Sequence, residues 1–231
     1  KFGVFNNISF ELRKGEILGF AGVEGSGKEI LCDVLCGDDD FTSGEISLFG
    51  KNKVFKAPND ALKSGLLCVP KERRDDGMIG MLSISDNICI SSLDRISKFG
   101  VLSSKKIFDI AMYWVKTIAI KCFNIKDRVS QLSGGNAQKV IFARALESQA
   151  PILILNHPTR GVDIGAKEEI YRIIRDITNK GISIILLGDT LDECIGLSNR
   201  IIVLKDGIIN GEFLCHKDNK PSQLDIVKKM M

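Results

Sequence analysis

The segment Gly22-Val-Glu-Gly-Ser-Gly-Lys28 decides the fold that the sequence predicts. It matches the pattern G-x-x-x-x-G-K and lies between residues 16–21, which read as a buried strand, and residues 28–36, which read as a helix. Glycines let backbone N–H groups turn inward around a phosphate, and the helix N-terminus and Lys28 add positive charge. We therefore expect a phosphate-binding loop formed by Gly22, Glu24, Gly25, Ser26, Gly27, Lys28 and Glu29.

Size and composition are typical of a soluble globular protein, with 231 residues, 44% hydrophobic and 26% charged. The net charge of +3 is small and the basic residues are spread along the chain, which argues against a nucleic-acid surface or a polybasic anchor. No apolar run approaches the roughly 18–20 residues of a membrane-spanning helix, and no signal peptide is visible. Because Lys1 opens directly in strand-like sequence, we expect the chain to be part of a longer protein.

The seven cysteines show no paired metal-binding spacing. Cys32 and Cys36 would share one helix face, but a pair of thiols lacks the further ligands that a zinc site requires. We expect reduced and mostly buried thiols of a cytosolic protein.

Strand and helix patterns alternate along much of the chain. Alternation of this kind predicts a mainly parallel sheet with right-handed crossovers, while the leading hairpins predict an antiparallel addition. From residue 81 to about residue 121 we expect helices and no strand, which indicates an inserted helical lobe. The expected strands are 5–12, 16–21, 44–49, 51–55, 65–69, 152–155, 182–187, 200–204 and 208–213, and the expected helices are 28–36, 59–64, 84–90, 104–120, 133–149, 164–179 and 191–196.

A second glycine-rich segment, Leu132-Ser-Gly-Gly-Asn136, opens the predicted helix 133–149. Two glycines and a serine at a helix start offer backbone donors and a hydroxyl to an anion, but they cannot enclose it alone. The same segment also fits a plain loop in which Ser133 is the N-cap. Further along the chain, the buried strand 152–155 runs into Asn156-His157.

With these segments in place, the chain resembles the nucleotide-binding domain of ABC transporters. Over nearly its full length it is similar to the second ATP-binding half of bacterial sugar importers of the ribose and galactose class. Four segments carry the resemblance: Leu18–Gly22, Lys71–Gly77, Leu132–Lys139 and Pro158–Lys167. The resemblance implies an α/β P-loop NTPase (ABC ATPase) fold within one domain, residues 1–231. Its core with an antiparallel β lobe would comprise 1–80 and 136–231, and its helical lobe about 81–135.

The resemblance also implies a function. A two-half ATPase on the cytoplasmic face of a membrane permease would couple ATP binding and hydrolysis to sugar import, with ATP and Mg²⁺ as cofactors. Asp163 matches the family residue that crosses the interface between the halves, and it also fits an N-cap for the helix from 164. Each nucleotide would lie between the phosphate loop of one half and the signature segment of the other, here Leu132, Ser133, Gly134, Gly135 and Asn136. The implied partners are the first nucleotide-binding half, transmembrane permease subunits and, indirectly, a solute-binding protein, but no nucleic acid.

The sequence departs from the family pattern around one site. Glu29 stands where a Ser or Thr hydroxyl should contact Mg²⁺, and Asn156 stands where an Asp should hold it. His157 occupies the place of the catalytic Glu, and Asp189 that of the switch histidine. Pro70-Lys71 stands where family members have Gln-Glu or Ser-Glu, so no Gln is available there. One hypothesis is that Glu29 and Asn156 are a paired exchange that keeps the charge around the metal. Losing a general base typically costs about 10²–10⁴ in rate.

We therefore expect a degenerate half that donates its signature segment to an intact partner site. Three alternatives stay open: a competent ATPase that uses Glu29 for the metal and His157 for the water, an importer of nucleosides rather than sugars, and a non-transport ABC scaffold. Phe2 and Phe5 are the candidates to stack on adenine, and we assign Arg144 and Arg172 to solvated helix faces.

Overall fold

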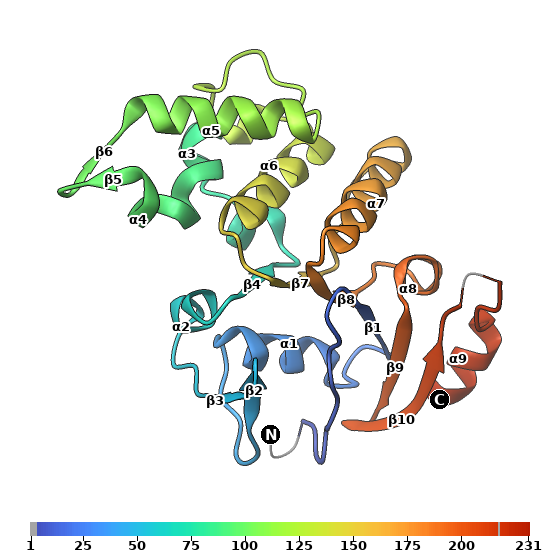
Figure 1. Ribbon diagram of the computed structural model, residues 1–231. Coiled ribbons are helices and arrows are strands. Elements are labelled where there is room, and N and C mark those ends of the chain that lie inside the picture. Colours follow the sequence, from blue (N-terminus) through green and yellow to red (C-terminus); the bar gives the residue numbers. More distant parts are fainter. Residues whose placement is uncertain (1–3, 217) are drawn as a thin grey trace. The chain divides into compact units, whose positions relative to one another are not determined.

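The computed structural model describes residues 4–216 and 218–231, which form two compact units (Figure 1). The first, here called the sheet unit, comprises Lys1–Cys68, Ala150–Pro158 and Ile174–Met231. The second, the helical unit, comprises Val69–Gln149 and Thr159–Ile173. The helical lobe expected at about 81–135 lies within the helical unit.

A six-stranded sheet, in the order β10-β9-β1-β8-β7-β4, forms the centre of the sheet unit (Figure 1). β1 pairs in parallel with β8 and β9, and β7 pairs in parallel with β8, while β10 is antiparallel to β9. β1, β7 and β8 are buried along their whole length, as strands covered on both faces must be, which explains their near-continuous apolar sequence. The strands are β1 Ile17–Ala21, β4 Leu66–Val69, β7 Ile152–Asn156, β8 Ser183–Leu187, β9 Arg200–Lys205 and β10 Ile208–Leu214.

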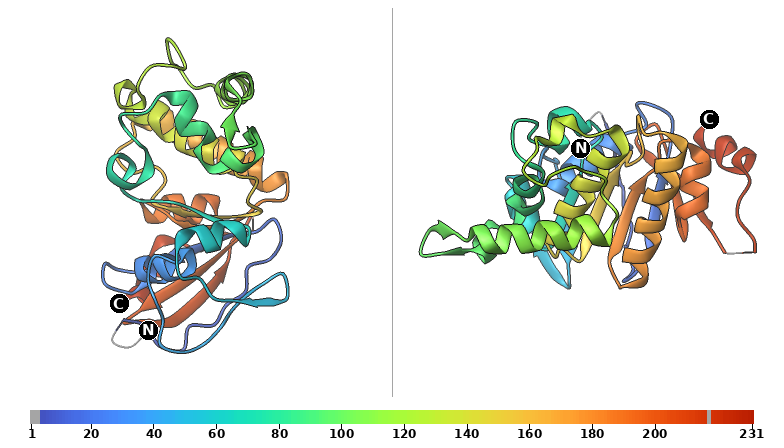
Figure 2. Two further views of the ribbon diagram at one scale, coloured as in Figure 1. Left: turned by 90° about the vertical axis from the view of Figure 1, so that its left-hand side faces the viewer. Right: turned by 90° about the horizontal axis from the view of Figure 1, so that it is seen from above.

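Helices and a short hairpin complete the sheet unit. α1 ends at Gly37, whose left-handed backbone (φ 80°) closes the helix, as glycine at a helix end commonly does. α9 packs on β9 and β10 (Figure 2), and its Ile226 joins a buried cluster with Ala21 and Val203. The elements are α1 Lys28–Cys36, α2 Pro58–Lys63, α8 Leu191–Leu197, α9 Gln223–Met230 and the hairpin of β2 Ile46–Leu48 with β3 Lys51–Lys53.

The helical unit is built on α6, against which α3 and α5 pack. α7 begins in this unit and ends in the sheet unit, because the division falls between residues 173 and 174. Within residues 4–216 and 218–231, every helix is too short or too polar to span a bilayer. The elements are the π-helix η1 Arg73–Gly77, α3 Ile84–Cys89, the 3₁₀ turns η2 Ile90–Ser92 and η3 Val129–Gln131, α4 Leu93–Ile96, β5 Ser97–Lys98, β6 Val101–Leu102, α5 Ser104–Thr117, α6 Gly134–Glu147 and α7 Ile164–Asn179.

A buried ion pair ties the starts of β1 and β9 together. Arg200 Nε donates to Glu16 Oε1 at 2.7 Å and Arg200 Nη2 donates to Oε2 at 3.2 Å. Arg200 Nη1 also donates to Glu212 Oε1 at 3.1 Å. Burial raises the pKa of Glu16, but the hydrogen bond from Arg200 and a backbone N–H outweigh it, so the net pKa is lowered.

Several expectations from the sequence are wrong. Residues 5–12 form no strand: their alternate apolar side chains pack on the core, as in the edge-to-face contact of Phe10 with Phe20, but the backbone is not paired as a strand. Residues 81–121 contain the hairpin of β5 and β6. The structure also contains η1 and α9, which the sequence patterns did not predict.

Arg144 is a further correction. It is half-buried, and its guanidinium is held inside the unit: Nε donates to the carbonyl of Asn87 at 2.8 Å and Nη2 donates to Asn87 Oδ1 at 2.6 Å. Burial lowers the pKa of Arg144 to about 10. The helix carrying it is buried on nearly every side, so an arginine there must find partners inside the protein. Arg172 is exposed, as expected.

The thiols agree with the expectation of reduced, mostly buried cysteines. All seven are free, and five are buried. Burial raises the pKa of Cys89 to about 11 and that of Cys194 to about 12, which makes these thiols poor nucleophiles. No group of three or more His, Cys, Asp or Glu side chains in the described residues is arranged to hold a metal ion.

Candidate nucleotide site

The phosphate loop follows β1 and runs into α1, as the sequence predicted. Gly25 and Gly27 have left-handed backbones with φ of 83° and 92°, a conformation that glycine adopts at little cost. A Cβ at Gly22 would lie 2.7 Å from the carbonyl oxygen of Leu204, so the close approach of loop and β9 requires glycine there. The glycines therefore have the conformational roles that a phosphate cradle needs.

Three buried side-chain atoms at this site have no hydrogen-bond partner among the described residues: Ser26 Oγ, Asn156 Oδ1 and His157 Nε2. Buried polar atoms are normally hydrogen-bonded, and a bound ligand would supply the partners that these atoms lack. Ser26 lies inside the loop, and its hydroxyl fits a phosphate oxygen. The chain's residues thus fit the triphosphate of a nucleotide.

Lys28 is already paired with the residue that follows it. Its Nζ lies 2.8 Å from Glu29 Oε1 and donates to the carbonyl of Val23 at 3.3 Å. His157 Nε2 lies 3.8 Å from the same Glu29 oxygen, longer than a hydrogen bond. Burial alone would raise the pKa of Glu29, but His157, Lys28 and a backbone N–H outweigh it and lower the pKa to about 2. The Glu29 carboxylate is therefore charged at neutral pH and forms an ion pair with Lys28 of the phosphate loop.

The backbone holds His157 in an unusual conformation at the carboxyl end of β7. Its φ of 49° is left-handed, a region in which histidine is more frequent than most non-glycine residues. Its N–H donates to the carbonyl of Leu187 at 2.8 Å, so the adjoining strand β8 fixes the turn. This turn brings the imidazole to Glu29 and places Asn156 at the end of the strand.

Asp189 follows β8 at the same edge of the sheet. Its N–H donates to Glu193 Oε2 at 3.3 Å, and Thr190 Oγ1 caps α8 by accepting from the N–H of Glu193 at 3.2 Å. The preceding Gly188 is tightly enclosed, since a Cβ there would lie 2.9 Å from the carbonyl oxygen of Thr190. Ligands of open α/β sheets bind outside the carboxyl ends of the strands, which is where Asp189, Asn156 and the loop lie.

The residues that fit a nucleotide do not offer Mg²⁺ its usual ligands. The hydroxyl expected after Lys28 is replaced by Glu29, whose carboxylate is paired with that lysine. The amide of Asn156 supplies a neutral oxygen where a carboxylate would bind the hard cation more strongly. As they stand, these side chains do not form a magnesium site.

The signature segment opens α6 in the helical unit. Ser133 occupies the N-cap position as expected, but its hydroxyl makes no bond to the helix backbone and accepts instead from Asn136 Nδ2 at 3.0 Å. Asn136 Oδ1 in turn accepts from the N–H of Lys121 at 2.8 Å. The serine and asparagine are therefore held by each other and by the preceding loop, which leaves the first N–H groups of the helix without a side-chain cap.

The loop 159–163 packs against the signature glycines through a residue that sequence reasoning did not single out. Arg73 donates from Nη1 to the carbonyl of Arg160 at 3.3 Å and from Nη2 to that of Gly161 at 3.5 Å. A Cβ at Gly134 would lie 3.1 Å from Arg73 Nη2 and 3.2 Å from the carbonyl of Gly161. In the sequence Arg73 is only one residue of the segment 71–77 that resembles the family, and no sequence pattern predicts its π-helical backbone.

Asp163 occupies its predicted N-cap position, and Phe5 lies near the phosphate loop. Asp163 Oδ1 accepts from the N–H of Ala166 at 2.9 Å, so the predicted N-cap of α7 is confirmed. A Cβ at Gly27 would lie 3.6 Å from the Cβ of Phe5, which places this aromatic residue beside the phosphate loop. The other adenine candidate, Phe2, lies outside the described residues.

Comparisons with known proteins agree with this geometry. Residues 5–160 match the family model described as "ABC transporter". The chain is 39% identical to the xylose import ATP-binding protein XylG of Thermoanaerobacter pseudethanolicus over 91% of its length, and 39% identical to the ribose import ATP-binding protein RbsA of Oceanobacillus iheyensis over 92%. The aligned parts cover 42% and 43% of those proteins, so the chain spans less than half the length of these relatives.

Solved structures of low sequence identity share the fold. A nucleotide-free ATP-binding cassette from an ABC transporter matches with a TM-score of 0.82 at 19% identity, covering 99% of this chain and 92% of that one. A dimeric ATP-binding cassette bound to ADP and Pi matches with a TM-score of 0.78 at 22% identity, covering 92% and 91%. With the phosphate loop on β1 and α1 and the signature segment opening α6, the chain belongs to the ABC transporter family and has the fold of its ATP-binding cassettes.

Proposed function

We propose that this chain is one ATP-binding half of a sugar importer, with a degenerate hydrolytic site of its own and a signature segment that completes the site of a partner half. The observation that carries the proposal is the arrangement around Lys28. The ammonium group of Lys28, which should bind the nucleotide, lies 2.8 Å from Glu29. The strand that should lead into two acidic residues leads into Asn156 and His157.

The phosphate loop of this half retains the residues that bind a nucleotide. The left-handed glycines and the buried, unpaired hydroxyl of Ser26 support a phosphate cradle, and Phe5 lies beside it. When bound, ATP supplies the triphosphate whose terminal group is transferred to water. In this half no carboxylate follows β7 to receive a proton from that water, so binding without turnover is the expected behaviour.

The signature segment retains what a donor needs. The N-terminus of α6 offers backbone N–H groups that no side chain caps, and an anion can bind to such groups. Gly134 and Gly135 pack closely against Arg73 and Ala166, which leaves little space for a Cβ at either position. Arg73 adds a positive charge next to Gly134. Such a half-site cannot enclose a phosphate alone, which supports a partner whose phosphate loop brings the nucleotide to it.

The kind of solute follows from the relatives' names. XylG and RbsA are named for xylose and ribose import, and the chain aligns with less than half of each. We infer a pentose or related sugar as the transported solute, a first nucleotide-binding half, permease subunits and a solute-binding protein as partners, and the cytoplasmic face of the membrane as the location.

A titration and a turnover assay test the proposal. The purified chain should bind ATP, measured by calorimetry, and Lys28→Ala should abolish that binding, while no steady phosphate release is detected. Sustained release that Lys28→Ala abolishes would contradict the degenerate site.

His157→Ala then examines the competing function, for which the 3.8 Å contact of His157 with Glu29 is the favourable observation. If His157 were the base, its removal would lower turnover by about 10²–10⁴ with nucleotide binding unchanged. In a preparation that contains both nucleotide-binding halves, Ser133→Arg should stop turnover at the partner's site, and full turnover in that variant would refute the donor role.

A further inference from the structure

We propose that the β5–β6 hairpin of the helical unit is a membrane-contacting tip that inserts its apolar side chains among anionic lipid headgroups. The tip is defined as residues 97–102. The inference goes beyond nucleotide chemistry, and it rests on the proposed function only in that this function brings the chain to a membrane.

The tip exposes apolar side chains that no local requirement explains. Ser97 pairs with Leu102 and Lys98 with Val101, and the turn between them has left-handed backbone at Phe99 (φ 53°) and Gly100 (φ 78°). Gly, Asn and Asp are the usual residues of such a turn, so the backbone conformation does not explain an aromatic residue there. Phe99 is 95% exposed and Val101 is 71% exposed, so neither contributes to the core.

The base of the hairpin is firmly attached. Ile96 is buried, and the N–H of Ser103 donates to its carbonyl at 3.3 Å. Lys106 Nζ donates to the carbonyl of Arg95 at 3.2 Å, and the Arg95 guanidinium pairs with Glu147 of α6 at 2.8 Å. Because these contacts fix the base, the exposed tip is a constant feature of this unit rather than a frayed end.

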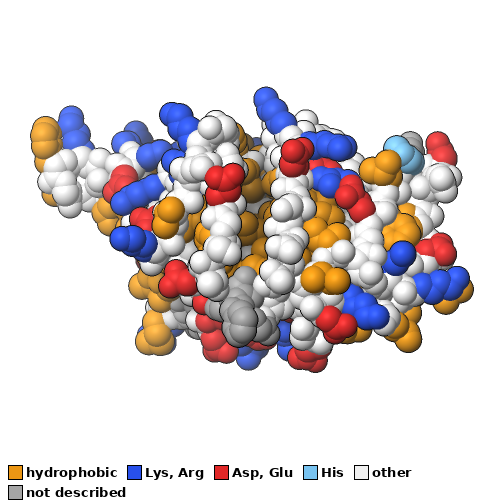
Figure 3. Space-filling view, turned by 90° about the horizontal axis from the view of Figure 1, so that it is seen from below, with side chains coloured by type: hydrophobic (Ala, Val, Ile, Leu, Met, Phe, Trp, Pro, Cys, Tyr) orange, Lys and Arg blue, Asp and Glu red, His pale blue; other side chains and the backbone are white. Residues whose placement is uncertain are grey.

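The charges around the tip match an anionic surface. Residues 95–108 contain four basic residues and no acidic one, with Asp94 and Asp109 just outside this range. Glu147 offsets the charge of Arg95, which leaves Lys98, Lys105 and Lys106 as the charges near the tip. Lys98 Nζ lies 5.8 Å from the centroid of the Phe99 ring, and orange and blue side chains lie together at the hairpin end in Figure 3. At the boundary between lipid headgroups and hydrocarbon, lysine side chains typically place their methylene groups against apolar side chains and their ammonium group among the headgroups.

The size of the patch favours lipid over protein. A stable protein interface buries about 800 Å² on each partner, far more than one turn and two short strands can supply. Shallow insertion into headgroups needs only a few apolar side chains, and anionic lipid adds attraction for each nearby lysine. We therefore commit to a lipid surface as the occupant.

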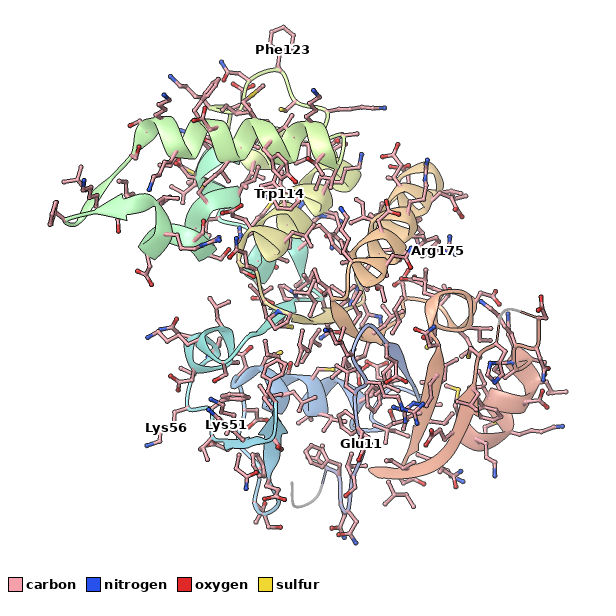
Figure 4. The ribbon with its side chains drawn as sticks, in the orientation of Figure 1. Glu11, Lys51, Lys56, Trp114, Phe123 and Arg175 are labelled. Carbon is pink, nitrogen blue, oxygen red and sulfur yellow. The ribbon has the colours of Figure 1, made fainter. Side chains whose placement is uncertain are left out.

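Phe123 supplies a matched control. It is fully exposed, lies on the loop between α5 and α6 of the same unit, and points outward there (Figure 4). Lys121 and Lys126 are close to it in sequence, so its electrostatic setting is similar. It differs from Phe99 in having no exposed apolar neighbour in the chain, since Cys122 is half-buried and Asn124 is polar.

Flotation of the chain with vesicles tests the proposal. The chain should bind vesicles containing about a third phosphatidylglycerol and not vesicles of phosphatidylcholine alone, and high salt should release it. Phe99→Ser should lower the partition roughly tenfold, and Lys98→Gln and Lys105→Gln roughly fivefold each. Phe123→Ser should leave it unchanged. Circular dichroism confirms that each variant is folded.

The outcomes separate this proposal from the proposed function. Equal binding to both vesicle types, no binding, or equal losses in Phe99→Ser and Phe123→Ser would each overturn it. If the chain does not bind vesicles, and Phe99→Ser abolishes its binding to a permease subunit, the tip contacts a protein instead. Vesicle binding that depends on Phe99 in a chain that binds no ATP would uphold the tip and refute the nucleotide role.

Discussion

Replacing Glu29 by Gln should tighten metal-free binding of ATP to this chain. In the native protein the carboxylate lies 2.8 Å from Lys28 Nζ, and its charge also opposes the approach of phosphate. Glutamine keeps the shape of the side chain and removes the charge, so Lys28 becomes available to the nucleotide. The opposite expectation holds if Glu29 is a magnesium ligand, since its loss would then weaken binding of ATP with Mg²⁺.

The pKa of Glu29 sets the size of the effect. Its fall from 4.5 to about 2 corresponds to about 3 kcal/mol at roughly 1.4 kcal/mol per pKa unit. His157 contributes more of this than Lys28 does, and solvent screens a further part because 26% of the side chain is exposed, so we take about 1 kcal/mol for the contact with Lys28. If Glu29→Gln makes that amount available to the nucleotide, the dissociation constant for ATP should fall roughly fivefold.

Isothermal titration with ATP, once with a chelator and once with Mg²⁺, measures both constants. Glu11→Gln is the control, because Glu11 is an exposed acid of the same unit and its loss changes the net charge equally. The reasoning is refuted if Glu29→Gln leaves the metal-free constant within twofold of the native value, or if Glu11→Gln changes it as much. Weaker binding of ATP with Mg²⁺ in Glu29→Gln would favour the paired exchange with Asn156.

Three further predictions concern stability and local order. Arg200→Ala should lower the free energy of unfolding by about 3–5 kcal/mol in urea titrations because it leaves a buried carboxylate unpaired, whereas loss of the half-exposed partner in Glu212→Gln should cost less than about 1 kcal/mol. The pKa of Glu29 in the folded protein lies below 4.5, so its contribution to the free energy of unfolding is complete above pH 4.5 and is lost as the pH falls toward about 2. The difference in unfolding free energy between the native protein and Glu29→Gln should therefore be about 2 kcal/mol at neutral pH and vanish near pH 2. Arg73→Ala should speed hydrogen exchange in residues 159–163, because it removes two hydrogen bonds worth about 1 kcal/mol together. If exchange is equally fast in Arg73→Ala and in its neighbour Arg74→Ala, these bonds do not order the loop.

The central strands and the phosphate loop could be predicted because their signals are local. The apolar runs of β1, β7 and β8 and the glycines before Lys28 carry their own structural requirements, and the observed elements match them closely. Residues 5–12 show the limit of such patterns. Their alternation places side chains on the core correctly, but a strand also needs a partner backbone, which no local pattern specifies.

Arg144 and Arg73 show what pattern reading missed in the helical unit. An arginine with an acidic residue nearby on a predicted helix is expected to be exposed, yet Arg144 contacts Asn87, which lies far from it in sequence. Arg73 reaches a loop that lies far along the chain, and it does so from a π-helix that has no recognised sequence pattern. In both cases the decisive contact joins segments that only folding brings together.

By itself, the sequence determined the family, the phosphate loop and the loss of acidic residues after β7, because each depends on residue types in consecutive positions. Only the tertiary structure decided that His157 lies 3.8 Å from Glu29, that Arg73 lies against Gly134, and that Phe99 is exposed on a fixed hairpin. The physical reason is that charge pairing and burial depend on distances in space, and those distances are set by packing between segments far apart in the chain.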